Sequence, residues 1–123
     1  MLSNESRLLV ADNSGAKELL IIRCLGGSNR KFSRVGDLVV ASVKKATPSA
    51  TIGKKKIVTA VIVATKYGFV RKDGTKVRSS ANYAVIVKVG DRNYSASRII
   101  VPIPREFDEW GYKKIISLAP EVI

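Results

Sequence analysis

Short runs of valine and isoleucine recur along this chain of 123 residues, and each run is bounded by glycine, proline, aspartate or asparagine. Runs of this length, separated by turn residues, are typical of a meander or small barrel of β-strands. We therefore predict an all-β fold with strands over residues 7–11, 18–24, 37–44, 57–66, 83–89 and 97–101. The length fits one domain that spans residues 1–123.

Asp73-Gly74 is the strongest hairpin signal in the sequence, because a two-residue turn of type I′ needs positive φ at both positions. We predict a β-ribbon over about residues 66–80, with a two-residue turn that pairs Arg71 with Lys76. Alternation of side chains would then put one set on the same face: Phe69, Arg71, Lys76 and Arg78. Like charges this close destabilise a free hairpin, so a nearby anion is expected.

The last quarter of the chain changes character at Pro102 and Pro104, which fit a sheet ladder poorly. Pro104 suits the first position of a helix, and we predict a C-terminal helical segment over about residues 104–119. This segment consists of two helical pieces, over residues 105–110 and 113–118. In the first piece, Phe107 and Trp110 share one face. Neither piece is long enough to be stable alone, so both should pack on the barrel.

The net charge of +12 comes from 22 Lys and Arg against 10 Asp and Glu, and it is concentrated in one segment. Between Arg30 and Arg78, thirteen basic side chains meet only Asp37 and Asp73, so this segment alone carries +11. Such a block would repel itself on a compact surface, which implies a polyanionic partner.

Histidine is absent, and Cys24 is the only cysteine. Without histidine the chain lacks the usual nucleophile pairs and proton carrier near pH 7. One cysteine makes neither an internal disulfide nor a thiolate metal cage, so we expect no metal, no cofactor and a reduced compartment. Residues 12–15 and 26–29 are interpreted as turns rather than polar sites, since nothing pairs with Ser14 as a base.

The amino-terminal residues lack the basic start and apolar stretch of a secretory signal. The longest apolar runs, such as residues 60–64, are far shorter than the roughly 20 residues of a membrane-spanning helix. We therefore expect a protein without a membrane partner.

Several motifs occur along the chain in this order: Ala11-Asp12-Asn13-Ser14-Gly15-Ala16, Leu25-Gly26-Gly27-Ser28, Lys45-Ala46-Thr47-Pro48, Asp73-Gly74 and Lys114-Ile115-Ile116-Ser117-Leu118-Ala119-Pro120-Glu121-Val122. With these motifs the chain resembles the bacterial version of universal large-subunit ribosomal protein fourteen, from about Arg7 to its last residue. Two positions depart from the family pattern and indicate a divergent member. Ser79 stands where the family has an aromatic residue, and Val101 stands where it has glycine.

The resemblance implies a five-stranded closed β-barrel with a protruding β-ribbon and one or two short C-terminal helices. It also implies a structural constituent of the large ribosomal subunit and not an enzyme. Such a protein binds large-subunit rRNA, touches neighbouring ribosomal proteins, bridges to small-subunit rRNA and helps a ribosome-silencing factor to dock. The expected location is the ribosome of a bacterial cytoplasm, or an organelle-encoded equivalent.

The side chains expected to bind rRNA phosphates lie within the central basic segment: Arg30, Lys31, Arg34, Lys44, Lys45, Lys54, Lys55, Lys56, Arg71, Lys72, Lys76 and Arg78. For Arg30, Lys31 and Arg34, and for residues 54–56, the alternative is a loop that is exposed to solvent. For the ribbon, the alternative is contact with a neighbouring protein. Tyr67 and Phe69 could stack on a base, but packing across strands is favoured.

The acidic residues Glu106, Asp108 and Glu109 form a local cluster of negative charge that RNA would avoid. We therefore assign this region to protein contact or solvent, and we expect Phe107 and Trp110 to form the packing face of its helix. The candidate protein-partner surface comprises Arg98, Phe107, Trp110 and Ser117.

A free-standing β-barrel that binds RNA as a translation factor is the alternative function. Such factors usually present several exposed aromatic side chains on their strands, on which bases stack. The eight aromatic residues of this chain are scattered, and three of them lie in the C-terminal piece. The ribosomal protein is therefore the favoured interpretation.

Overall fold

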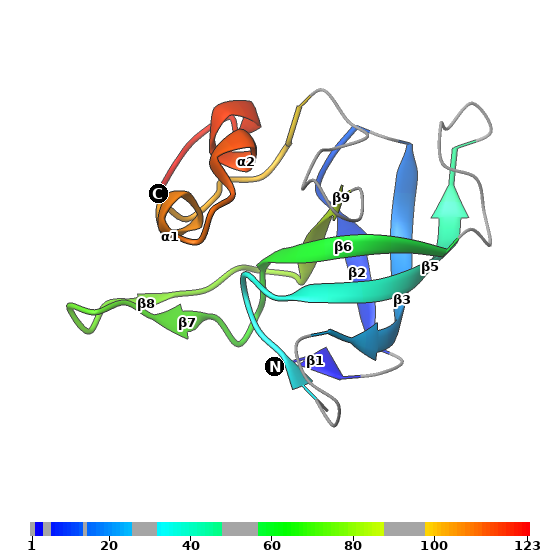
Figure 1. The fold of residues 1–123 in the computed structure, drawn as a ribbon, viewed down its shortest axis with the longest axis horizontal. Helices are drawn as coiled ribbons and strands as arrows, with labels where there is room; N and C mark the ends of the chain where they lie inside the picture. Colours follow the sequence, from blue (N-terminus) through cyan, green and yellow to red (C-terminus); the bar gives the residue numbers. More distant parts are fainter. Residues whose placement is uncertain (1, 4–5, 14, 26–31, 48–56, 88–97) are drawn as a thin grey trace.

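The computed structural model describes residues 2–3, 6–13, 15–25, 32–47, 57–87 and 98–123. Figure 1 shows a barrel from which a two-stranded ribbon projects, with two short helices lying beside the barrel on the ribbon's side. The closed barrel has the strand order β2 (Arg7–Val10), β3 (Ala16–Cys24), β5 (Leu38–Ala46), β6 (Ile57–Ala64) and β9 (Tyr83–Val87). Neighbouring strands are antiparallel except β2 and β9, whose parallel pairing closes the barrel.

Strands β6 and β9 are buried on both faces. Ala60 and Ile62 alternate with Val61 and Val63, and the two pairs belong to different apolar clusters. The first cluster fills the barrel together with Leu8, Leu19, Ile21, Val39, Val43 and Ile86. The second packs against the outside of the wall and includes Val85, Ile99, Ile103, Phe107, Tyr112 and Ile115. Strands covered on both faces have continuous rather than alternating apolar sequences, and the two runs here follow that rule.

The C-terminal segment covers the outer face of this wall. It contains α1 (Glu106–Glu109) and α2 (Lys113–Leu118), with Phe107 fully buried at the centre of its cluster. The Phe107 ring meets those of Trp110 and Tyr112 at centroid distances of 5.2 and 5.6 Å. In the part of the chain that the structure describes, no helix combines the length and apolar character needed to cross a membrane.

Short strand pairs and isolated bridges complete the described fold. β1 (Leu2–Ser3) pairs with β4 (Phe32–Ser33), and β7 (Phe69–Val70) pairs with β8 (Lys76–Val77) to form the ribbon. An isolated parallel bridge joins Ile103 to Val122 and holds the end of the chain along the C-terminal segment.

The five-stranded closed barrel, the ribbon and the two C-terminal helices confirm the predicted fold class. The predicted strand at 97–101 is wrong over its described residues, where Ile99 makes only an isolated bridge to Asp12. The N–H of Ile99 donates to Leu118 O and that of Ile100 to Ala11 O, so this segment connects α2 to the barrel instead of extending a ladder. β1 and β4, two residues each, were not predicted because neither has a periodic pattern.

Gly68 begins the ribbon in a conformation that other residues adopt only with strain. Its φ is +74°, and a Cβ atom built there would lie 2.2 Å from Val77 O and 2.7 Å from Arg78 Cβ. Gly74, at the ribbon tip, has a φ of +90° but nothing within 4 Å of its Cβ position. Gly68 thus allows the two strands to meet where the ribbon leaves the barrel.

We expect Gly68→Ala to lower the free energy of unfolding by about 3 kcal/mol. A left-handed backbone costs a non-glycine residue about 1 kcal/mol or more, and overpacking adds about 2 kcal/mol. Urea unfolding measures the loss. The control is Gly74→Ala, which has the backbone cost without the overlap and should lose only about 1 kcal/mol. Equal losses in the two variants would contradict the close approach at Gly68.

Candidate nucleic-acid interface

The ribbon turns through a loop of three residues, not two. Phe69 pairs with Val77 and Val70 with Lys76, while the N–H of Arg71 donates to Thr75 O at 2.8 Å. The predicted register is therefore wrong by one residue. Asp73-Gly74 also suits a type I turn followed by a left-handed glycine, which is the common three-residue hairpin, and the φ of Gly74 fits that loop.

This shift of register moves Arg71 away from the other ribbon cations. By alternation, Lys76 and Arg78 share one face of the ribbon, and Phe69 and Arg71 lie on the opposite face with Val77. The predicted grouping of Arg71 with Lys76 and Arg78 is thus wrong, because one residue of slippage exchanges the faces.

The face with Lys76 and Arg78 is open to solvent. Both side chains are exposed, as are Val70 and Tyr67, and Lys76 Nζ lies 5.2 Å from the centre of the Tyr67 ring. Within the described residues, no carboxylate lies within ion-pair distance of Lys72, Lys76 or Arg78. A narrow strip with uncompensated cations and an exposed aromatic ring can meet phosphates and the edge of a folded RNA.

Arg71 on the opposite face has partners within the protein. Its Nε lies 2.9 Å from Glu106 Oε2, and its Nη2 donates to Ile123 O at 2.6 Å. Only 12% of the Arg71 side chain and 18% of the Glu106 side chain are exposed. The structure thus gives this predicted rRNA ligand a carboxylate on α1 as its partner.

Asp73 shapes the tip of the ribbon. The N–H of Thr75 donates to Asp73 Oδ1 at 2.9 Å, and this hydrogen bond lowers the pKa of Asp73 below its ordinary value of 3.8. The Thr75 hydroxyl and the guanidinium groups of Arg105 and Arg71 act in the same direction. The carboxylate therefore holds the loop at neutral pH but also places one negative charge among the ribbon cations.

A second cationic area lies on the barrel, around Glu18. Arg7 on β2 and Lys45 on β5 flank this carboxylate, and Lys45 Nζ lies 3.6 Å from Glu18 Oε2. The hydrogen bond from Arg7 is the largest cause that lowers the pKa of Glu18 below 4.5. Lys44 precedes Lys45 on β5, whose last residues lie at the end of the barrel away from the ribbon (Figure 1).

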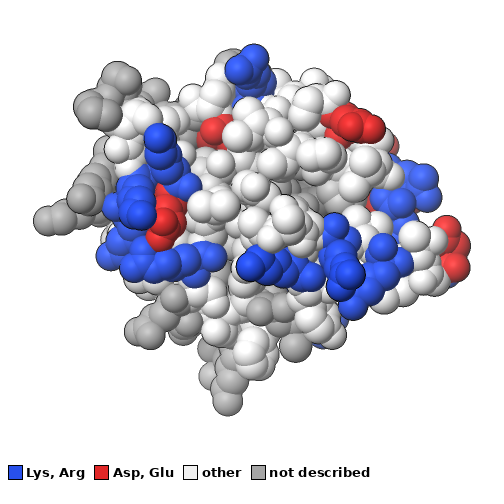
Figure 2. Space-filling view, turned by 180° about the vertical axis from the view of Figure 1, so that it is seen from behind, with Lys and Arg blue, Asp and Glu red and all other residues white. Residues whose placement is uncertain are grey.

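Figure 2 shows how Lys and Arg are distributed on the face opposite to that in Figure 1. They form a broken band across its lower half, with a group around an acidic side chain at one edge and a second group toward the other edge. Above the band, the visible surface carries one basic group at the top and two acidic groups, and the rest is uncharged. On this face most of the Lys and Arg side chains thus lie along a strip.

The structure describes seven of the predicted rRNA ligands. Arg34 is exposed, and its N–H donates to Asp37 Oδ2 at 2.8 Å in the turn before β5. Five predicted ligands lie outside the described residues: Arg30, Lys31, Lys54, Lys55 and Lys56. The described cations divide between the ribbon, the turn at Arg34 and the far end of β5.

The predicted protein-partner residues do not form one surface. Phe107 is fully buried, so its assignment to a partner surface is wrong, and its role is packing. Trp110 is 39% exposed and lies beside Phe69 of the ribbon, at a centroid distance of 5.9 Å. Arg98 and Ser117 are both exposed. They lie on neighbouring segments, because a hydrogen bond from Ile99 N to Leu118 O joins the backbones beside them.

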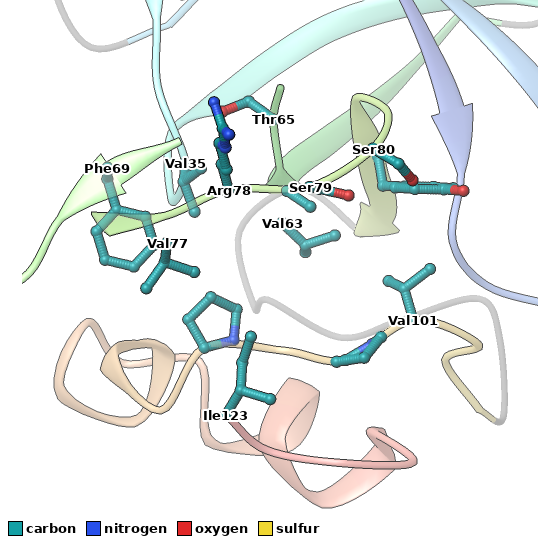
Figure 3. Close-up of a pocket in the computed structure, with 14 residues that line it drawn as sticks. Val35, Val63, Thr65, Phe69, Val77, Arg78, Ser79, Ser80, Val101 and Ile123 are labelled. Atoms are coloured by element: carbon teal, nitrogen blue, oxygen red, sulfur yellow. The ribbon is translucent and has the colours of Figure 1, made fainter. Parts of the chain in front are cut away.

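A cavity of about 270 Å³ lies between the ribbon, the barrel wall and the C-terminal segment. Figure 3 shows Phe69 and Val77 on the ribbon side of this space, Ile123 on the side of the C-terminal segment and Val63 on the side of the barrel wall. Ser79 and Val101 both line this space.

Sequence patterns did not point to Arg7 and Glu18 as parts of a charged cluster, because these residues lie in segments whose net charge is zero. The only available signal was alternation, which puts both on the outer side of neighbouring strands. Asp12 was interpreted only as a turn residue, but it is buried and accepts a hydrogen bond from Ile86 N at 3.1 Å. In the described ranges, no group of three or more His, Cys, Asp or Glu could hold a metal ion.

A closed five-stranded barrel whose exposed ribbon carries cations without described carboxylate partners fits the class of small β-barrel proteins that bind nucleic acids. The chain belongs to the ribosomal protein L14p/L23e family, whose model matches residues 1–123. A member of this family is a structural constituent of the ribosome that binds rRNA and contacts other ribosomal proteins. The family match gives no support to the alternative of a free-standing translation factor.

Proposed function

We propose that this protein binds large-subunit rRNA through the exposed face of its ribbon, formed by Val70, Lys76 and Arg78, together with Lys72 at the tip. The observation that carries this proposal is that these cations are exposed and lack described carboxylate partners, while the other face of the ribbon packs on the protein. Further proposed rRNA contacts are Arg34, Arg30, Lys31, Lys54, Lys55 and Lys56, and, at the far end of β5, Lys44 and Lys45.

The proposed mechanism is electrostatic and geometric. Arginine grips two phosphate oxygens at once and lysine acts as a point charge, so both neutralise closely spaced phosphates. The barrel fixes the ribbon and the turns in one arrangement, and this arrangement selects an RNA of matching shape. Because bound cations release counterions, affinity should fall steeply with salt.

We further propose that the cations at the far end of β5 take part in bridges to small-subunit rRNA. Two areas of positive charge at opposite ends of one rigid barrel support this, since a single RNA-facing surface would need only one of them. Lys44 and Lys45 are the described candidates.

We also propose a protein-facing surface around Arg98 and Ser117, which neighbouring ribosomal proteins and a ribosome-silencing factor would contact. The backbone bond between Ile99 and Leu118 supports this by holding the two exposed side chains on adjacent segments. The motif resemblance supports a bacterial ribosome or its organelle-encoded equivalent, and a divergent family member. The core cluster shared by the barrel wall and the C-terminal segment supports one domain over residues 1–123.

The variant Lys76→Ser/Arg78→Ser tests the ribbon. We expect its affinity for isolated large-subunit rRNA to fall about tenfold or more, because hydrogen bonds from charged groups are lost. The slope of log affinity against log salt should become shallower by about 2, or about 1 for each lost phosphate contact. Filter binding at several salt concentrations measures both. The control Lys17→Ser/Lys114→Ser removes two exposed cations elsewhere and should change little. An unchanged slope in the ribbon variant would refute the proposal.

The variant Lys44→Ser/Lys45→Ser tests the bridge. Large subunits carrying it should associate less with small subunits, because cations that face small-subunit phosphates are missing. Light scattering during a magnesium titration should show a midpoint shifted to higher magnesium. Lys17→Ser serves as the control on the neighbouring strand. Normal association of the double variant would show that this area does not form a bridge.

Arg98→Glu tests the protein-facing surface. A charge reversal at this exposed position should weaken binding of a purified silencing factor about tenfold, because like charges replace complementary ones. Surface plasmon resonance with the full chain measures the change. Arg23→Glu, at an exposed position on β3, should bind as the parent does. Equal affinities of the parent and Arg98→Glu would contradict this surface.

A further inference from the structure

Arg71 joins three parts of the molecule that are distant in sequence. Its guanidinium contacts Glu106 on α1, at 2.9 Å from Oε2 and 3.3 Å from Oε1, and the carbonyl of Ile123 at 2.6 Å. These contacts use two of the five N–H donors of the guanidinium, and with only 12% of the side chain exposed the other donors have limited access to a phosphate. The contacts of Arg71 are therefore those of a structural clamp.

Apolar contacts reinforce this clamp on the same face of the ribbon. The Phe69 ring packs edge-on against Trp110, with a centroid distance of 5.9 Å. Trp110 in turn lies against Gly36, where an added Cβ would be 2.8 Å from Trp110 Cε3. The ribbon, α1 and the turn before β5 are thus stacked in one row, with Val77 facing the C-terminal segment (Figure 3).

The ribbon needs such an anchor because its own ladder is short. β7 and β8 contribute two residues each, and an isolated two-stranded hairpin is at best marginally stable in water. Without contacts to α1, the direction of the ribbon would be set only by its connections to the barrel. The orientation of Lys76 and Arg78 would then vary.

We propose that Arg71 is a positioning residue, which holds the ribbon against α1 so that Lys76 and Arg78 meet rRNA in a fixed geometry. This inference rests on the proposed rRNA contact of the ribbon. It also excludes Arg71 from the phosphate ligands, because its departure to RNA would leave the partly buried Glu106 with only the more distant Arg105, whose Nε lies 4.0 Å from Oε2. Loss of the close partner of a partly buried charge is costly. Preorganisation of this kind raises affinity by reducing the ordering required on binding.

The variant Glu106→Gln separates a clamp from simple electrostatics. Loss of a negative charge near the ribbon, with Arg71 released, should raise rRNA affinity if charge alone mattered. The clamp predicts the opposite, a loss of about fivefold, because the ribbon is no longer held in the binding geometry. Tighter binding by Glu106→Gln would overturn the proposal.

Arg71→Ala is compared with Lys76→Ser in the full chain. Arg71→Ala should bind rRNA about fivefold more weakly with an unchanged salt slope, whereas Lys76→Ser should make the slope shallower by about 1. A slope reduced equally in both variants would show that Arg71 is a phosphate ligand and would overturn the proposal. If Lys76→Ser leaves binding and slope unchanged, the proposed rRNA contact fails instead.

Hydrogen exchange of the free protein tests the clamp without RNA. Amides of residues 69–78 should exchange faster in Arg71→Ala and Glu106→Gln than in the parent, while those of β3 and β6 keep their protection. Lys76→Ser should match the parent. Unchanged exchange of the ribbon amides in both clamp variants would overturn the proposal whatever the RNA result, and retained protection of the barrel shows that the variants fold.

Discussion

Burial of β6 and β9 on both faces is the constraint on which the rest of the structure depends. Their inner side chains fill the barrel, and their outer side chains require a cover, which Ile103 and Phe107 provide. Because the C-terminal segment must lie on this wall, Trp110 and Glu106 come within reach of the ribbon. Hydrophobic burial thus decides where the acidic helix lies, and the ion pair with Arg71 then decides where the ribbon points.

The net charge of the chain overstates the charge available to a polyanion at any one place. Glu18 partly neutralises Arg7 and Lys45, and Glu106 neutralises Arg71. Lys72, Lys76 and Arg78 on the open face and tip of the ribbon stay without described carboxylate partners, as do cations elsewhere on the surface such as Lys17 and Arg23. Internal pairing therefore lowers the charge available around Glu18 and beside α1, which a count over the sequence cannot express.

The barrel strands could be predicted from the sequence because alternation, continuous apolar runs and turn residues are local signals. The parallel pairing of β2 with β9 could not, since it joins segments far apart in the chain. The ribbon register was missed because Asp73-Gly74 suits both two-residue and three-residue loops. The partner of Arg71 lies 35 residues away, so its role depended on the packing of the C-terminal segment.

The parallel pairing of β2 with β9 has a consequence for how the chain acquires its structure. During synthesis β2 emerges early but has no second neighbour until β9 is complete, and the outer wall stays uncovered until α1 and α2 follow. Non-local pairings of this kind slow folding, because loop closure precedes the contacts that stabilise it. The newly made protein thus passes through a period with apolar strands exposed, in which binding to a polyanion or a chaperone would protect it from aggregation.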